Sequence, residues 1–139
     1  MTILRGACRG ALVTGPVTVT TSAGRDQQRA WLTEALRQQG VTVVAAGGTE
    51  VRLVGYGDEP GDLSAGAAVT VAMDTPFVLR SATSPAVLST YSSSRPAMGA
   101  LAAVLAGTAT APGRSPVDVS GLPRSACTER SVLNGGTRR

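Results

Sequence analysis

The sequence predicts an α/β protein, in the form of a three-layer α/β/α sandwich with a mostly parallel sheet. Short segments rich in Val, Thr, Ala and Leu recur along the chain and alternate with segments whose apolar residues have helical spacing. Strands that are buried on both faces form continuous apolar runs, and their alternation with helices is typical of a parallel sheet. The 139 residues suffice for one domain, and the aromatic content of 3% predicts an aliphatic core.

The first strand is expected at residues 16–20, where β-branched residues follow a glycine. A helix is expected over residues 25–40, because four apolar side chains recur there at helical spacing. These side chains belong to Trp31, Leu32, Ala35 and Leu36. Asp26 near the start and Arg37 near the end of the segment suit the helix dipole, and Gly40 provides a stop.

Further strands follow this helix. Four of them are expected at residues 41–46, 50–56, 67–73 and 85–91, and residues 115–120 are a candidate for a last one. Each segment is short and rich in β-branched or small apolar residues. Pro76 can open a short helix between two of these strands, because proline is tolerated in the first turn of a helix.

A second long helix is expected over residues 96–106. Its apolar stripe consists of Met98, Leu101, Ala102 and Leu105. Gly99, Ala100 and Ala103 keep the remaining surface thin, so a sheet or a neighbouring helix can approach closely. We therefore expect a packing element between layers, which Gly107 ends.

The charge pattern favours a solvated, mildly basic surface over a nucleic-acid partner. The net charge is +4, and the 13 basic residues are all arginines that lie singly along the chain. A nucleic-acid site would concentrate such residues in a patch or stripe. No run of about 18 apolar residues is present, so no membrane span is expected. The N-terminal segment is too short and too interrupted for a signal peptide.

The two cysteines, Cys8 and Cys127, lie near opposite ends of the chain. Without histidine they cannot form an ordinary zinc site, and neither a metal nor a cofactor is expected. Two alternatives remain open, a disulfide and two unpaired thiols. A disulfide between such distant positions would contribute about 4 kcal/mol by the loop-closure argument.

The absence of histidine excludes a nucleophile activated by a Ser–His or Cys–His pair. The loop GYGDEPG (55–61) does not have the glycine spacing of a dinucleotide site, so it is interpreted as a turn-rich surface loop. Asp58, Glu59 and Asp62 in this region are interpreted as surface carboxylates, and no catalytic residue is assigned.

Asp74 and Thr75 follow the strand expected at 67–73. Ligands gather outside the carboxyl ends of parallel strands, so these residues are candidates for a binding rim. The alternative, which the position before Pro76 favours, is that Asp74 or Thr75 caps a helix.

The loop 91–95 is the second candidate region. Ser92, Ser93 and Ser94 are expected to supply a helix N-cap. Together with Tyr91 and Arg95 they form an alternative site for an anion or a sugar hydroxyl, because hydroxyls, backbone N–H groups and a guanidinium meet there.

Five segments occur in a distinctive order between residues 69 and 123. They are TPFVL, VLSTY, SSSRP, LAAVLAG and APGRSPV. In this order they resemble the C-terminal domain of glycoside hydrolase family three, most closely its actinobacterial β-N-acetylglucosaminidase branch, which acts on cell-wall sugars. The strand–helix–strand order before residue 69 is compatible with the same domain. Arg95 stands where the family often has proline, and Pro96 is displaced by one position.

The resemblance implies a sandwich of helices around a mostly parallel sheet, in a domain that follows a catalytic (β/α) barrel. The barrel carries the nucleophile and, in this branch, an Asp–His acid/base pair. This chain has no histidine and falls short of the roughly 200 residues that a barrel needs. We therefore expect a non-catalytic accessory domain over 1–123 with a tail at 124–139, packed on a barrel in the same or a partner chain.

The loops expected to shape the barrel's active-site rim are those of Asp74–Thr75 and Tyr91–Arg95. The alternative is a free-standing module that binds a carbohydrate or an anion through loop 92–95. A homodimer that buries the barrel-facing surface is a further possibility. The resemblance implies an extracellular or cell-envelope location for the parent protein, with the cytoplasm as the alternative.

Overall fold

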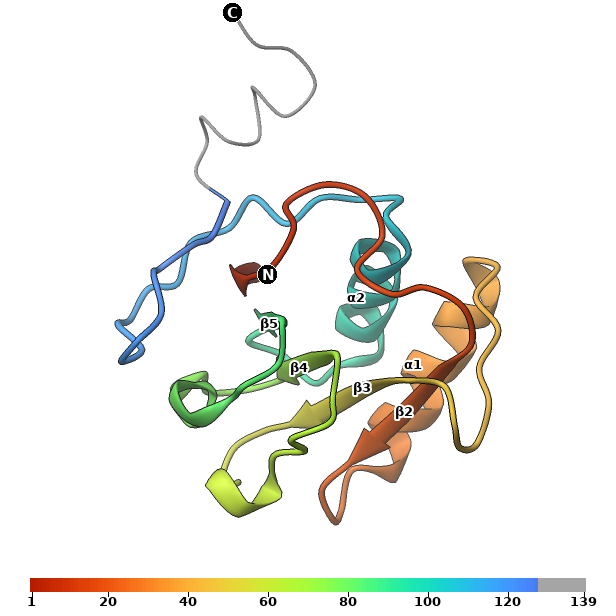
Figure 1. Ribbon diagram of the computed structural model, residues 1–139, viewed down its shortest axis with the longest axis horizontal. Helices are drawn as coiled ribbons and strands as arrows, with labels where there is room; N and C mark the ends of the chain where they lie inside the picture. The colour runs from red at the N-terminus through yellow and green to blue at the C-terminus, as the bar shows by residue number, and fades with distance from the viewer. Residues whose placement is uncertain (128–139) are drawn as a thin grey trace, which may run out of the picture.

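A computed structural model describes residues 1–127 of the protein (Figure 1). It contains five strands, two α-helices and two short 3-10 helices in one mixed α/β fold. In chain order these elements are β1 (Thr2–Arg5), β2 (Val17–Thr21), α1 (Asp26–Gln38), β3 (Thr49–Val54), η1 (Pro60–Asp62), β4 (Val69–Ala72), η2 (Phe77–Ser81), β5 (Ala86–Ser89) and α2 (Arg95–Ala106).

The five strands form one mostly parallel sheet in the order β1-β5-β4-β3-β2. Strands β2 to β5 are parallel, with Val51 of β3 lying between Val19 of β2 and Val69 of β4. Strand β1 joins the sheet antiparallel to β5. The carboxyl ends of the four parallel strands therefore meet at one edge of the sheet, which we call the carboxyl edge.

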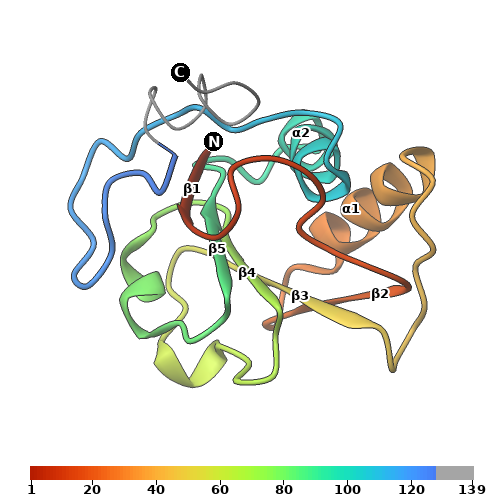
Figure 2. The ribbon, with the colours of Figure 1, turned by 45° about the horizontal axis from the view of Figure 1, so that its top comes forward.

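Both α-helices pack against the same face of the sheet (Figure 2). Leu32 and Leu36 of α1 and Leu101 and Leu105 of α2 are fully buried in one aliphatic core with the side chains of this face. The other face carries a smaller core that includes Leu79 of η2. The mixed α/β architecture is thus confirmed, but a three-layer sandwich is not, because the connections on this second face contain only η1, η2 and extended segments.

Most of the expected elements are present. The strands expected at 16–20, 50–56, 67–73 and 85–91 correspond to β2, β3, β4 and β5, and the two expected helices correspond to α1 and α2. The short helix after Pro76 is η2, which has 3-10 geometry. Helix α2 ends at Gly107, whose left-handed backbone (φ 86°) closes the helix as expected.

Residues 41–46 do not form the expected strand. They run along the outer edge of β2, where Val17 donates its N–H to Thr42 O and accepts from Val44 N, so Val43 makes one isolated bridge. Gly48 then lies so close to the start of β2 that a Cβ atom on it would be 2.8 Å from Pro16 O, and β3 begins at the next residue. The apolar run is therefore a loop that covers part of an edge strand.

Residues 115–120 do not form a strand either. Val119 makes a single bridge to Leu122 and packs into the smaller core. Strand β1 was not identified from the sequence, and its position at the sheet edge explains this. It is a four-residue strand whose pairing partner, β5, lies more than 80 residues further along the chain.

Cys8 and Cys127 are joined in a disulfide with a Cα–Cα distance of 5.5 Å. The alternative of two unpaired thiols is therefore wrong. Ala126 N donates to Ile3 O at 2.7 Å, and Ser115 N donates to Arg124 O at the same distance. The first residues of the segment expected as a tail (124–139) thus contact the body of the domain, and those from 128 onward lie outside the described residues. Over residues 1–127, none of the helices combines the length and the apolar character that crossing a bilayer requires.

Candidate functional site

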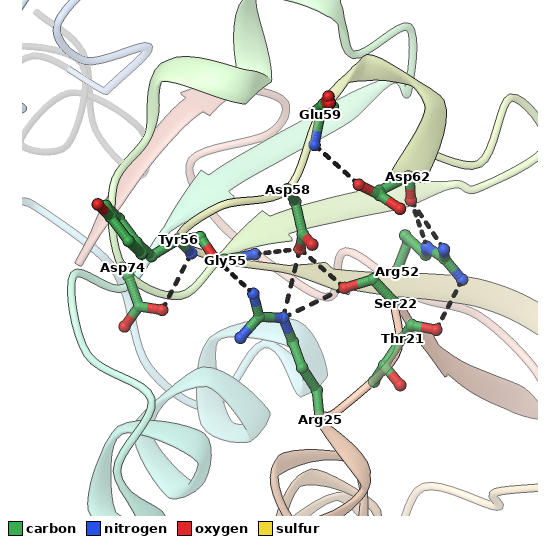
Figure 3. Close-up of polar contacts among 10 residues, drawn as sticks. All are labelled: Thr21, Ser22, Arg25, Arg52, Gly55, Tyr56, Asp58, Glu59, Asp62 and Asp74. Carbon is green, nitrogen blue, oxygen red and sulfur yellow. Dashed lines mark hydrogen bonds and ion pairs between the residues drawn. The ribbon is translucent and has the colours of Figure 1, made fainter.

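The candidate site lies at the carboxyl edge, where the loops after β2, β3, β4 and β5 lie next to one another. The parallel register brings them together: β2, β3, β4 and β5 all point toward this edge. Ligand sites of parallel sheets form at such an edge. The polar contacts among the first three loops are drawn in Figure 3.

Asp58 forms the centre of these contacts. Its Oδ2 atom accepts hydrogen bonds from Gly55 N at 2.7 Å, from Ser22 Oγ at 2.8 Å and from Arg25 Nε at 3.3 Å (Figure 3). Arg25 also donates to Tyr56 O at 2.9 Å. The side chains of Arg25 and Asp58 are only 18% and 11% exposed. This ion pair therefore locks the loop after β2 to the loop after β3.

The pKa of Asp58 is lowered from its ordinary value of 3.8. Burial acts against ionisation, but the hydrogen bonds from Gly55 and Ser22 and the charge and hydrogen bond of Arg25 together outweigh it. Asp58 is consequently a carboxylate at neutral pH, which makes it an acceptor of hydrogen bonds and unsuited to act as a general acid there.

Asp74 lies against the loop after β3. Its Oδ2 atom accepts a hydrogen bond from Tyr56 N at 3.2 Å (Figure 3). A Cβ atom on Gly55 would lie 2.8 Å from that same Oδ2 atom and 2.9 Å from Cζ of Arg25. A side chain at position 55 would therefore require the Asp74 carboxylate or the Arg25 guanidinium to shift.

The expectation that Asp74 or Thr75 caps the following helix is wrong. The N-cap residue of η2 is Pro76, and no side chain makes a capping hydrogen bond there. Asp74 instead bonds to Tyr56, and Thr75 is exposed. The reason is that η2 begins one residue later than a helix capped by Thr75 would, which frees Asp74 to face the neighbouring loop.

The carboxylates of the loop after β3 are more than surface residues. Glu59 and Asp62 form a reciprocal capping box around η1, with Glu59 N donating to Asp62 Oδ2 at 2.8 Å. Arg52 of β3 holds the same turn by donating to Asp62 O from Nη2 at 2.7 Å and to Thr21 O from Nη1 at 3.1 Å. The turn is thus fixed against the sheet and presents Asp58 at a defined place.

The loop after β5 is occupied mainly by local contacts. Ser94 is the N-cap of α2, as expected of this serine run, and its Oγ accepts from Ala97 N at 3.2 Å. Ser92 Oγ donates to Ser94 Oγ at 3.0 Å. Arg95 forms an exposed ion pair with Glu34 of α1 at 3.3 Å.

Tyr91 is a non-glycine residue with positive φ (59°), and its hydroxyl donates to Thr2 Oγ1 at 3.0 Å. Ser93 lies half-buried in the same loop. The parallel register places the 74–75 and 91–95 loops at the same edge. Among residues 1–127, however, no hydrogen bond or ion pair joins a side chain of one of these loops to the other.

Two large apolar side chains are exposed at this edge. Tyr56 is 75% exposed in the loop after β3, and Phe77 is 51% exposed at the start of η2. Between the two loops lies a hollow of about 230 Å³ lined by residues that include Gly55, Asp58, Glu59, Thr75, Phe77 and Arg80. A larger hollow of about 580 Å³ lies along α1 and residues 43–45, away from these side chains.

Sequence reasoning did not identify Asp58, Phe77 or Arg80 as site residues. The available signal was positional: Asp58 follows a predicted parallel strand just as Asp74 does, and Gly57 before it allows the chain to turn there. The ion pair of Asp58 with Arg25 could not be predicted from the sequence, because the two residues are 33 positions apart. In the described part of the chain, no three His, Cys, Asp or Glu residues are grouped so that they could hold a metal ion.

The fold and this edge define the class of protein as a mixed α/β domain with a mostly parallel sheet and a polar, partly aromatic carboxyl edge. No protein-family model matches the chain, and no curated protein or solved structure matches it either.

Proposed function

We propose that this chain is a non-catalytic accessory domain of the glycoside hydrolase family three type. In this proposal it packs through its carboxyl edge against a catalytic (β/α) barrel, in the same or a partner chain, and shapes the rim of the barrel's active site. A β-N-acetylhexosaminidase-like partner that processes cell-wall sugars is implied by the resemblance. The observation that carries the proposal is the exposure of Tyr56 and Phe77 on adjacent loops of that edge.

Exposed aromatic side chains favour a docking role for the edge. Aromatic residues are enriched in protein interfaces, where their burial contributes strongly to binding. Tyr56 and Phe77 flank the rim candidates Asp74 and Thr75. An interface built on these aromatics would therefore bring the rim candidates close to the partner.

The carboxylates of the edge support an accessory role over a catalytic one. Hydrolysis of a glycoside uses a pair of carboxyl groups, one of them protonated at the working pH. Asp58 is held ionised by its hydrogen bonds, and Asp74 binds the backbone of the neighbouring loop. Both groups thus act in positioning loops.

Two further parts of the proposal rest on the same resemblance. In the proposal, the segments with η1 and η2 take the place of the second helical layer of a three-layer α/β/α sandwich. An extracellular or cell-envelope location is supported by the Cys8–Cys127 disulfide, because disulfides persist in oxidising compartments.

The test combines the purified chain with the separately produced barrel of a family-three β-N-acetylglucosaminidase that lacks its own second domain. We expect light scattering to show a complex and turnover of a chromogenic N-acetylglucosaminide to rise above that of the barrel alone. The chain alone is expected to give no turnover. The double variant Tyr56→Ser/Phe77→Ser should lose the complex, whereas Gln39→Ser, at the opposite edge, should keep it.

A complex that survives the double variant would show that the edge is not the docking surface. Clear turnover by the isolated chain would contradict the accessory role itself.

A further inference from the structure

The hollow between the loop after β3 and η2 has the properties of a small ligand site. Its volume of about 230 Å³ lies below the roughly 300–1,000 Å³ of sites for drug-sized molecules, so it suits a ligand of about one ring. One wall is the turn that carries Asp58 and Glu59, and the other wall is η2 with Phe77 and Arg80. Both walls are fixed, the first by the Arg25 and Arg52 contacts and the second by the buried side chain of Leu79.

Several polar groups of this hollow have no partner within residues 1–127. All three hydrogen bonds to Asp58 end on Oδ2, so Oδ1 remains available. Neither the Thr75 hydroxyl nor the Arg80 guanidinium makes a hydrogen bond or an ion pair in this part of the chain. The hollow thus offers a fixed, ionised acceptor, a cationic donor and a hydroxyl that can serve as either.

The charges of the two walls determine the kind of ligand. An anion that binds Arg80 would meet Asp58 and Glu59 opposite, and a cation that binds the carboxylates would meet Arg80. Hydroxyl groups suit both walls, because each can donate to a carboxylate and accept from a guanidinium. The exposed ring of Phe77 supplies an apolar surface for the face of a ring-shaped ligand.

We propose that this hollow binds a single neutral, polyhydroxylated ring, that is, one monosaccharide unit. Asp58 Oδ1 accepts from a ring hydroxyl, Arg80 and Thr75 bond to others, and Phe77 packs against the ring's apolar face. The site differs from loop 92–95, where Ser94 and Arg95 already have partners. It does not depend on a barrel partner and belongs to the isolated chain.

The test is an NMR titration of the ¹⁵N-labelled full chain with glucose, with N-acetylglucosamine and, as the anion probe, with inorganic phosphate. We expect at least one sugar to give saturable shift changes at residues 55–60 and 75–80. The dissociation constant should be about 1–10 mM, in keeping with the few atoms of a single ring. Phosphate should give no saturable change at these residues.

Matched exposed residues provide the controls. Phe77→Ala and Arg80→Ala are expected to raise the sugar's dissociation constant at least about tenfold, the effect of losing one principal contact. Tyr56→Ala, an exposed aromatic outside the hollow, and Arg114→Ala, an exposed arginine elsewhere, should leave it within about twofold. Circular dichroism confirms that each variant is folded.

The proposal is overturned if no sugar gives saturable shifts, if phosphate binds at these residues instead, or if Tyr56→Ala weakens binding as much as Phe77→Ala. Its failure is distinguishable from failure of the docking proposal, since docking is measured with the barrel and depends on Tyr56. If the chain binds a sugar but forms no complex with the barrel, the monosaccharide site is supported and the accessory role is contradicted.

Discussion

The partly buried Asp58 and the fully buried Ser89 differ in how their side chains are hydrogen-bonded. Three donors converge on one oxygen of Asp58 and hold it ionised in a setting where burial alone would favour the neutral acid. The hydroxyl of Ser89, at the end of β5, is fully buried and, in the described part of the chain, has no hydrogen-bond partner. The first residue should therefore stabilise the fold, and the second should not.

Replacing Asp58 by Asn is expected to lower the free energy of unfolding at pH 7 by about 1–3 kcal/mol, because Arg25 then loses its charged partner in a mostly buried pair. The folded-state pKa of Asp58 lies below 3.8, so its contribution is present above that pH and is lost as the pH falls through the lower folded value. Denaturant unfolding at a series of pH values from 7 downward measures this, and the difference between the two proteins should shrink as the pH falls below 3.8.

Asp118→Asn is the control for this prediction. Asp118 also has a lowered pKa, through its hydrogen bond from Arg124, but this pair is exposed. Little change in the unfolding midpoint is therefore expected. An equal loss in the two variants would contradict a special role for burial at Asp58.

Replacing Ser89 by Ala should be neutral or should raise the free energy of unfolding by up to about 1 kcal/mol, because it removes an unpaired buried hydroxyl. Ser84→Ala is the matched comparison, since Ser84 is equally buried but shares a hydrogen bond of 2.6 Å with Thr70. That change should cost about 1 kcal/mol. Thermal unfolding of both variants tests this. A larger loss of stability on replacing Ser89 than on replacing Ser84 would contradict the unpaired state of the Ser89 hydroxyl.

At the scale of elements, the ends of the two α-helices differ in what surrounds them. Gly40 follows α1 and Gly107 follows α2, each with a left-handed backbone (φ 83° and 86°). Nothing lies within 4 Å of a Cβ atom built on Gly40, whereas one on Gly107 would lie 2.6 Å from Ala11 N. The N-terminal segment therefore packs directly on the end of α2, where Leu12 N also donates to Leu105 O.

This difference predicts unequal costs for the same substitution. Gly40→Ala should lower the free energy of unfolding by about 1 kcal/mol, the cost of a left-handed residue with a Cβ atom. Gly107→Ala should cost at least about 2 kcal/mol, because the backbone clash adds to that strain. Urea unfolding of both variants tests this, and equal costs would mean that the 10–12 segment moves freely away from α2.

At the scale of the whole molecule, the disulfide joins two segments that the sheet alone would not hold. Cys8 and Cys127 are separated by 119 positions, so the bridge closes a loop around nearly all of the described chain. Beyond this bond, the 124–127 segment contacts the body through hydrogen bonds to Ile3 and Ser115.

Reduction of this disulfide is expected to destabilise the protein by up to about 5 kcal/mol, because a long closed loop restricts the unfolded chain most. The melting temperature should therefore fall on addition of a thiol reductant. The double variant Cys8→Ser/Cys127→Ser should melt like the reduced protein and should not respond to reductant. Equal melting temperatures of the oxidised and reduced protein would show that the disulfide does not stabilise the fold.

The sequence by itself determined most of the local structure and the mixed α/β class, but not the number of layers. Spacing of apolar residues identified both helices, because one face of each helix is buried, and β-branched runs identified four of the five strands, because strands buried on both faces form continuous runs. The position of Asp74 after a strand placed it at the carboxyl edge, and the serine run predicted the cap of α2.

Only the tertiary structure decided what depends on distant pairing. The run at 41–46 has strand-like composition but lies where it can pair with only one residue of β2, and β1 exists only because β5 pairs with it. The joining of Cys8 to Cys127, the Arg25–Asp58 pair and the hollow beside Phe77 likewise bring together residues that no local pattern connects. Local spacing reports which side of an element is buried, whereas the choice of contacts between elements is made by the packing of the whole chain.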